Sequence, residues 1–145
     1  HKFLLTLWTK DVVDHSVENF DRFWTPGIRE EDAHYKELRQ QVDRGEKIWT
    51  DLKNVDSTDT DYAARSKQHI KGMTAFDQAW AANDNETGWA FKSSKQVNIL
   101  WGNGNVRPLS LQEMKEQYQL VNPDTDVFKT YGADSPHPAL QKLEN

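Results

Sequence analysis

The aromatic side chains constrain this sequence more than any other feature. Six Trp, six Phe and four Tyr occur among 145 residues, although hydrophobic residues make up only 36% of the chain and charged residues 28%. Rings of this size bury large apolar areas, which a solvated and disordered chain does not carry. A chain of this length can also remove about two thirds of its unfolded surface from water. We therefore expect one ordinary domain with a small core built around rings.

Charge and composition exclude several functional classes. The net charge is −5, and Lys and Arg are spread along the chain, so no basic stripe is available to neutralise nucleic-acid phosphates. The absence of cysteine excludes disulfides and thiolate metal sites. The longest apolar run, Phe3–Trp8, is too short to cross a membrane, and we expect no membrane insertion of this chain. Because the first residue is not Met, we interpret His1 as a cloning remnant or the start of an excised piece.

The first half of the chain has the apolar spacing of helices. Val13, Val17, Phe20 and Trp24 fall at i, i+4, i+7 and i+11, which places them on one helical face. A second helix is expected to begin near Glu30, and a third after the capping residues 56–59. The apolar positions that continue these two faces are Tyr35, Leu38, Val42, Tyr62, Ile70, Met73 and Trp80.

The second half combines a hairpin with one clearly capped helix. Residues 102–105, Gly-Asn-Gly-Asn, favour a tight turn because Gly and Asn tolerate positive φ. Ser110-Leu-Gln-Glu113 has the pattern of a capping box, and residues 122–123, Asn-Pro, stop the helix. The predicted fold is α+β, mainly helical over 12–82, with a small antiparallel hairpin near 89–109 and a capped helix over 111–121. We expect a single globular domain over 1–135 and a mobile tail over 136–145.

No arrangement in the sequence indicates an enzyme, a cofactor or a metal. The sequence lacks a Gly-x-Ser-x-Gly nucleophile turn, and His15, His34, His69 and His137 lack metal-ligand spacing. The acidic cluster at residues 56–61 misses the calcium-loop pattern and is interpreted as helix capping. We predict a protein without catalytic residues, cofactor or metal.

Exposed aromatic rings are the remaining candidates for function. Six Trp are too many to be fully buried in so small a domain, and Trp and Tyr dominate binding hot spots. Trp89, Trp101 and Tyr118 are therefore the predicted protein-interaction residues. The expected partner is another protein, with self-association into a homo-oligomer included and nucleic acid excluded.

Residues 56–121 combine an acidic, Thr/Ser-rich opening, a basic helix, a Trp-bearing segment before a polar turn, and a Leu-Ser-x-x-Glu helix. In this combination the segment resembles an uncharacterised C-terminal domain of bacteriophage tail-fibre and tail-assembly proteins. The resemblance implies a structural or assembly (chaperone) protein, located in the cytoplasm of an infected host or in the virion. Two alternatives stay open: a small inhibitor or immunity-type protein that binds an enzyme one to one, and an extracytoplasmic ligand-binding sensor domain.

Overall fold

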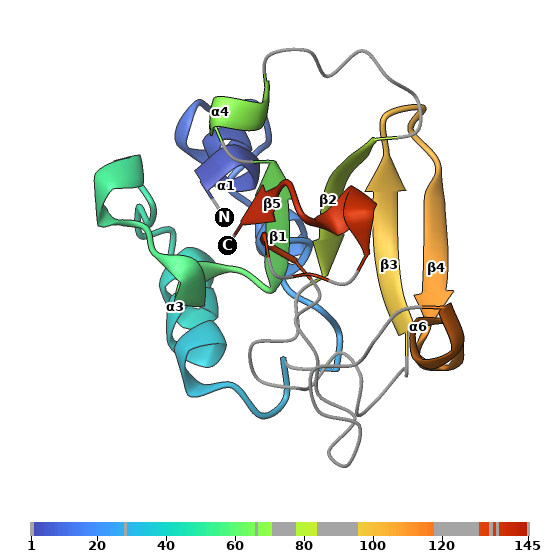
Figure 1. Ribbon diagram of the computed structural model, residues 1–145. Coiled ribbons are helices and arrows are strands. Elements are labelled where there is room, and N and C mark those ends of the chain that lie inside the picture. Colours follow the sequence, from blue (N-terminus) through green and yellow to red (C-terminus); the bar gives the residue numbers. More distant parts are fainter. Residues whose placement is uncertain are drawn as a thin grey trace. The chain divides into compact units, whose positions relative to one another are not determined.

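The computed structural model describes residues 2–27, 29–65, 67–70, 78–83, 96–117, 131–133, 135 and 137–144 (Figure 1). The chain divides into two compact units, one of residues 1–62 with 145 and one of residues 63–144. The expectation of a single domain over 1–135 did not anticipate this boundary. Each unit has its own core of buried hydrophobic side chains.

Unit 1 is built from short helices that begin at polar capping residues. Its elements are α1 (Lys2–Thr9), α2 (Val17–Asp21), α3 (Ala33–Asp43), and the 3₁₀ turns η1 (Leu52–Asn54) and η2 (Ser57–Asp59). Ser16, Asp32, Asp51 and Asp56 each accept a backbone N–H at the start of the element that follows. Such bonds satisfy amide groups that a helix leaves without an internal partner.

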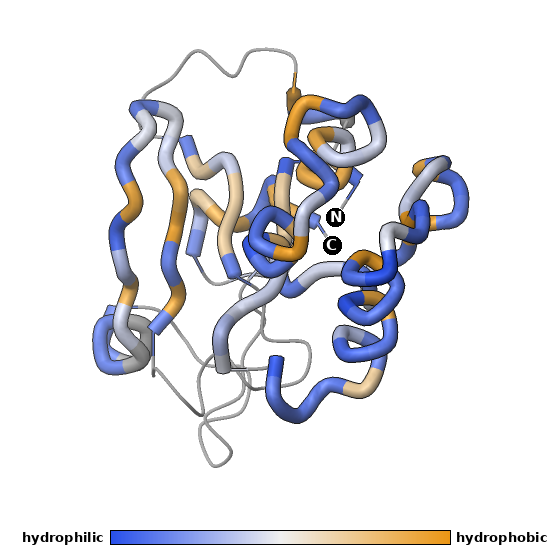
Figure 2. Tube along the Cα trace, turned by 180° about the vertical axis from the view of Figure 1, so that it is seen from behind, coloured by the Kyte–Doolittle hydropathy of each residue, from blue (hydrophilic) through white to orange (hydrophobic). Residues whose placement is uncertain are grey.

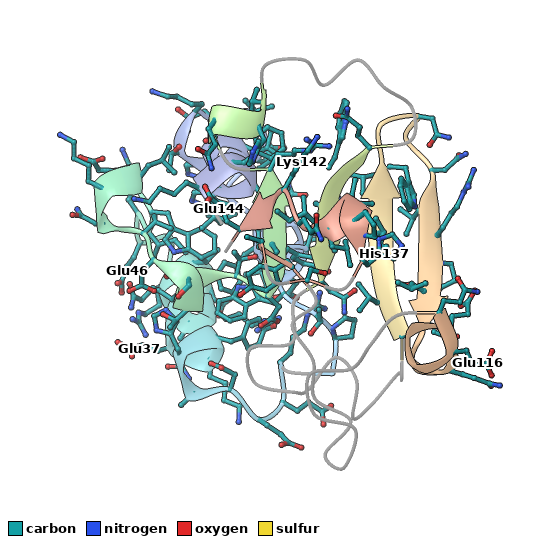
Figure 3. The ribbon with its side chains drawn as sticks, viewed as in Figure 1. Glu37, Glu46, Glu116, His137, Lys142 and Glu144 are labelled. Atoms are coloured by element: carbon teal, nitrogen blue, oxygen red, sulfur yellow. The ribbon has the colours of Figure 1, made fainter. Side chains whose placement is uncertain are left out.

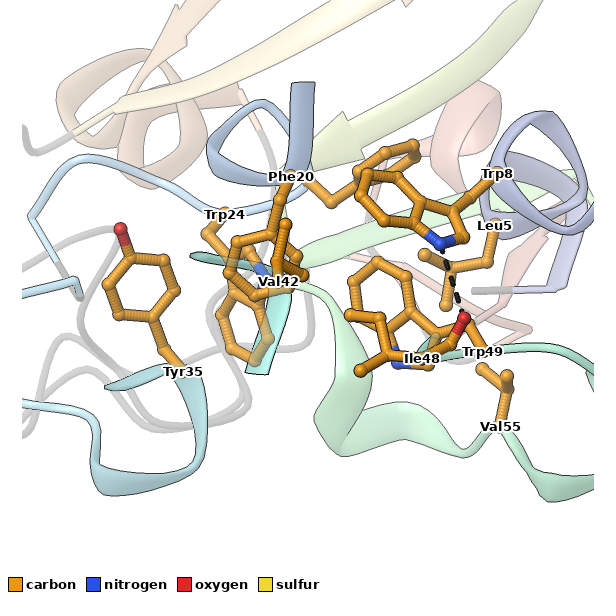
Figure 4. Close-up of a cluster of buried hydrophobic side chains, with 10 residues drawn as sticks. Leu5, Trp8, Phe20, Trp24, Tyr35, Val42, Ile48, Trp49 and Val55 are labelled. Atoms are coloured by element: carbon orange, nitrogen blue, oxygen red, sulfur yellow. Dashed lines mark hydrogen bonds between the residues drawn. The ribbon is translucent and has the colours of Figure 1, made fainter. Parts of the chain in front are cut away.

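The core of unit 1 is a cluster of aromatic rings. Phe20 is 0% exposed, and its ring centroid lies 5.3 Å from that of Trp49 and 5.6 Å from that of Tyr35 (Figure 4). Trp8 meets Trp49 edge to face at 5.6 Å, and its indole N–H donates to the Ile48 carbonyl oxygen at 3.2 Å. Rings thus supply the core of unit 1, as the composition predicts.

Unit 2 is organised around a five-stranded sheet in the order β4-β3-β2-β1-β5. The strands are β1 (Tyr62–Arg65), β2 (Ala79–Asn83), β3 (Gln96–Trp101), β4 (Val106–Ser110) and β5 (Leu143–Glu144). Helices α4 (Lys67–Ile70) and α6 (Leu111–Gln117) and the turn η3 (Pro138–Leu140) complete the described part of this unit. The pairs β1–β5, β2–β3 and β3–β4 are antiparallel.

Alternating side chains place the core of unit 2 on one face of the β3–β4 hairpin. Val97, Ile99 and Leu109 are buried, and Val97 is the cross-strand partner of Leu109. Figure 2 shows hydrophobic and hydrophilic residues alternating along these strands. Because successive side chains point to opposite faces of a sheet, the even-numbered residues of β3 and β4 lie on the other face.

The turn of the hairpin has the chemistry that its sequence predicts. Gly104 adopts φ of 80°, which a residue with a side chain rarely tolerates. The Asn105 amide donates to the Asn103 side-chain oxygen at 3.0 Å, and the Trp101 amide donates to the Asn105 carbonyl oxygen at 2.9 Å. The capping box that follows is also present, with the Ser110 amide donating to Glu113 and the Glu113 amide donating to Ser110 Oγ. The turn and the start of the capped helix are confirmed.

The mainly helical fold class is wrong, because a five-stranded sheet organises the second unit. The hairpin near 89–109 is the outer part of this sheet, with strands at 96–101 and 106–110. The helix expected from Tyr62 to Trp80 is replaced by β1, α4 and the start of β2 in the described residues. The prediction of one helix from Val13 to Trp24 is also wrong, because α2 spans only Val17–Asp21. For β1 and β2, the pairing of strands overrides the local helical spacing.

The last residues contain structure that the sequence did not predict. The predicted mobile tail, 136–145, includes η3 and β5, and Leu140 and Leu143 are both buried in the unit 2 core. Arg65 and Leu143 are cross-strand partners, as are Ala64 and Glu144. Of the capped helix expected over 111–121, Leu111–Gln117 is observed and the remainder lies outside the described residues.

Candidate functional site

Each unit presents one group of residues that merits consideration as a functional site. In unit 1 these are the polar side chains around two buried carboxylates. Asp59 is the last residue of η2, and Asp61 lies two residues later. In unit 2 they are the residues of the β3–β4 hairpin. Each group belongs to its own compact unit.

Asp59 is a buried carboxylate with three donors. Its Oδ1 accepts the Trp49 indole N–H at 2.9 Å and lies 3.1 Å from His34 Nε2, while its Oδ2 accepts the Asp56 amide at 2.9 Å. The Trp49 backbone has φ of 48°, a left-handed conformation that costs roughly 1–2 kcal/mol for a residue with a side chain. We infer that the bond to Asp59 and the burial of the Trp49 ring offset this strain.

Replacing Asp59 with Asn is expected to lower the free energy of unfolding by about 1–3 kcal/mol. An amide has one acceptor oxygen, whereas both oxygens of Asp59 accept bonds. The variant must therefore turn an NH₂ group toward one of the existing donors. Urea denaturation of both proteins measures the difference. Asp56→Asn is the matched control, because Asn is an equally good N-cap for η2; equal losses in the two variants would contradict this role for Asp59.

Asp61 is buried beside uncharged donors. Its Oδ2 accepts the Thr25 amide at 2.8 Å and lies 3.3 Å from Thr25 Oγ1. Desolvation by burial raises the pKa of the Asp61 carboxyl to about 6, against the opposing effect of the two Thr25 bonds. The negative charge of Asp32 raises the pKa of Asp61 further, and the positive charge of Arg29 lowers it. The carboxyl therefore changes charge near neutral pH.

A third carboxylate, Asp21, joins α2 to α3. Its Oδ1 accepts the Tyr35 hydroxyl at 2.7 Å and the Arg39 Nε–H at 3.2 Å. Burial, followed by the bond to Asp21, raises the pKa of the Tyr35 hydroxyl. Arg29 donates to the carbonyl oxygens of Asp21 and Trp24, and so fixes the end of the same helix. These polar groups connect the short helices of unit 1 around its aromatic core.

Unit 2 contains a buried guanidinium. Arg65 on β1 is 4% exposed, and donates from Nε to the Ala79 carbonyl oxygen at 2.7 Å and from an Nη to Gln78 Oε1 at 2.9 Å. Desolvation lowers the pKa of Arg65. Both of these acceptors are uncharged, so the two bonds hold the start of β2 without a neutralising carboxylate.

The hairpin carries the one predicted interaction residue that the structure describes. Trp101 is half-buried against the unit 2 core, on the same face of β3 as Val97 and Ile99. Its ring lies edge to face with His137, which is labelled in Figure 3, at 6.4 Å between centroids. Burial lowers the pKa of His137. The Trp101 indole N–H is buried and finds no acceptor within the described residues.

Trp89 and Tyr118, the other two predicted interaction residues, lie outside the described residues. The structure therefore does not bring the three predicted residues together. It draws attention instead to the outer face of the hairpin, which we define as Asn98, Leu100, Val106 and Pro108. Leu100 and Val106 are cross-strand partners, as are Asn98 and Pro108. Val106 is 62% exposed.

Sequence reasoning missed the outer face, although the alternation along β3 and β4 carries the signal. It also interpreted the aspartates at 56–61 only as caps. That interpretation is correct for Asp56, which caps η2, and for Asp59, which completes the capping box. The burial of Asp59 and Asp61, in contrast to the exposed Asp56, cannot be inferred from the local sequence.

No family model, curated protein or solved structure matches this chain. Within the described residues, no helix is long and apolar enough to cross a membrane. The same part of the chain contains no group of three or more His, Asp or Glu side chains placed to hold a metal ion.

Proposed function

We propose that the chain is a non-enzymatic protein-binding domain whose contact surface includes the outer face of the hairpin. The observation that carries the proposal is the apolar cross-strand pair on that face, the partly buried Leu100 and the largely exposed Val106, next to the exposed Pro108. Apolar side chains presented on a rigid sheet are suited to bury area against a partner. Asn98 on the same face offers an amide for a polar contact at the margin.

The chemistry of unit 1 supports a role in the fold for its buried or partly buried carboxylates. Asp21, Asp59 and Asp61 each accept bonds from side chains or amides of neighbouring elements. One donor to each comes from a residue far away in the chain, 14 positions for Asp21, 10 for Asp59 and 36 for Asp61. Groups used in this way connect segments, and we propose no reaction for them.

For the partner, we propose a bacteriophage tail-fibre component, with this chain acting as a structural part or as an assembly chaperone. The support for this choice is the resemblance of residues 56–121. An inhibitor or immunity-type protein bound one to one to an enzyme, and an extracytoplasmic ligand-binding sensor, are the alternatives. The acidic net charge of −5 is compatible with a basic enzyme as partner.

Light scattering coupled to size exclusion, over a range of protein concentrations, separates these proposals. Fibre parts assemble with closed cyclic symmetry, so a trimer that persists on dilution supports a structural part of the virion. A monomer at all concentrations contradicts that role and favours a chaperone, an inhibitor or a sensor domain. A thermal shift on addition of small metabolites would then support the sensor.

Replacing Val106 with Lys is expected to weaken the partner complex by about tenfold or more, because a charge is placed in the centre of the apolar contact. The measurement is the dissociation constant of the assembly that the wild type forms, with itself or with a co-expressed tail-fibre protein. Val12→Lys is the matched control, since Val12 is equally exposed at 65% but lies in unit 1. If both variants bind as the wild type does, the outer face is not the contact surface.

A further inference from the structure

The strand β4 forms one edge of the described sheet, and its backbone groups alternate between two directions. The Trp101 amide on β3 donates to the Asn105 carbonyl oxygen, so residue 105 faces β3. Residues 107 and 109 then also face β3, whereas residues 106, 108 and 110 face away from the sheet. The Asn98 amide on β3, which donates to Asn83 Oδ1 on β2, fits the same alternation.

The outward positions of β4 have few free donors. Pro108 has no backbone N–H. The Ser110 amide donates to Glu113 Oε2 at 2.9 Å, and the Ser110 hydroxyl donates to the same oxygen at 2.8 Å. The bonds from the Ser110 amide and then the Ser110 hydroxyl lower the pKa of Glu113. Of the three outward positions, Val106 alone has an amide that finds no acceptor within the described residues.

We propose that Pro108 and the Ser110–Glu113 pair together close this edge of the sheet to strand addition by a second copy of the chain. An unpaired edge strand is a template for another strand, and identical edges pair most simply about a two-fold axis. Pro108 at the centre of the exposed edge and a charged acceptor at its end are two independent obstacles. This inference concerns the backbone edge, and it does not rest on the proposed function of the outer face.

The geometry of a two-fold antiparallel pair of β4 strands shows how many backbone hydrogen bonds the two obstacles remove. Centred on Pro108, such a pair places Val106 of one copy opposite Ser110 of the other, and each outward pair exchanges two bonds. Three pairs would therefore offer six bonds. Pro108 removes both bonds of the central pair, and Glu113 holds the Ser110 amide that each outer pair requires. Two bonds, both donated by Val106, remain.

The test restores the missing donors in the full chain. The double variant Pro108→Thr/Glu113→Ala regains an amide at position 108 and releases the amide of Ser110. We expect its mass, measured by light scattering over a dilution series, to rise with concentration, with an association constant at least about tenfold above that of the wild type. An unchanged mass profile in a folded double variant would overturn the proposal.

Two controls separate the two obstacles from unrelated effects. Pro108→Thr/Glu113→Gln keeps a capping acceptor for Ser110, so we expect weaker association than in the Ala version. Arg107→Thr introduces the same new side chain on β4 without adding a backbone donor at the edge, and we expect the mass profile of the wild type. Association of Arg107→Thr as strong as that of the double variant would also overturn the proposal.

Amide hydrogen exchange keeps the proposal testable if the double variant does not fold. In the single variants, the Ser110 amide is expected to exchange about tenfold faster in Glu113→Ala than in Glu113→Gln or the wild type. Equal exchange in all three proteins would show that Glu113 does not hold this donor, and the closed edge would then be refuted.

Discussion

Replacing Phe20 with Ala is expected to lower the free energy of unfolding by about 3–5 kcal/mol. The centroid of the Phe20 ring lies 5.3 to 6.2 Å from the ring centroids of Trp8, Trp24, Tyr35 and Trp49. These large, rigid rings cannot collapse into the space that Phe20 leaves, so the cavity persists and adds to the lost transfer free energy. Phe20 also belongs to a helix of five residues, which has little stability without its tertiary contacts.

Urea denaturation followed by Trp fluorescence measures this loss, because Trp8, Trp24 and Trp49 all lie in the same cluster. Val12→Ala is the control, since this side chain is largely exposed and a change within about 0.5 kcal/mol is expected. A loss below about 1 kcal/mol in Phe20→Ala would mean that the cluster is not the source of stability in unit 1.

Replacing Asp61 with Asn is expected to stabilise the protein at pH 7.5 by up to about 3 kcal/mol and to have little effect at pH 4. The folded state raises the pKa of this carboxyl from 3.8 to about 6, and each pKa unit corresponds to about 1.4 kcal/mol. The folded state binds this proton more tightly than the unfolded state does. Protonation of Asp61 therefore contributes fully to the free energy of unfolding below pH 3.8, and this contribution is lost as the pH rises through 6. The amide of Asn carries no charge and avoids that loss, and its oxygen can accept the Thr25 bonds.

The difference in unfolding free energy between Asp61→Asn and the wild type should therefore grow between pH 4 and pH 7. The other titratable groups are the same in both proteins, and their effects cancel in the difference. A constant difference across the window would contradict the raised pKa. The carboxyl carbon of Asp61, followed by NMR as a function of pH, gives its pKa directly. Thr25→Val is a companion variant, because it removes the hydroxyl contact but leaves the Thr25 amide donor in place.

The local chemistry of turns and caps could be predicted from the sequence. Positive φ at Gly104 and the Ser110–Glu113 capping box depend on neighbouring residues, so four or five letters suffice to indicate them. The same holds for Asp56, which lies in the predicted capping cluster and caps η2. The second helix, expected near Glu30, begins at Ala33 after its cap Asp32.

The sheet could not be predicted, because its partners are distant in the sequence. β1 pairs with residues 143–144, and its buried Ala63 and Ala64 have the helix propensity of alanine. The same applies to the buried alanines of β2. A helix was the local preference in this region, and the long-range pairing of strands outweighs it.

The candidate site illustrates the same division between local and distant effects. Alternation along β3 and β4 is readable in the sequence, but the exposure of Val106 depends on which face the rest of unit 2 covers. Asp is a common capping residue, so the local sequence favours a cap at Asp61. The raised pKa of Asp61 arises instead from burial beside Thr25, which lies 36 residues earlier. The local sequence can predict that an Asp caps a turn, but it cannot predict that the side chain is buried.

The pairing of Ala64 with Glu144 has a consequence for how the chain is connected. The strand by which the chain enters unit 2 and the strand by which it leaves are hydrogen-bonded neighbours. A linker of a few residues could join β1 to β5. In a circular permutant of unit 2, the new ends would then lie at the hairpin turn of residues 102–105. Entry and exit at one point are also what a module needs if it is to be inserted into a loop of a host protein without separating the two sides of that loop.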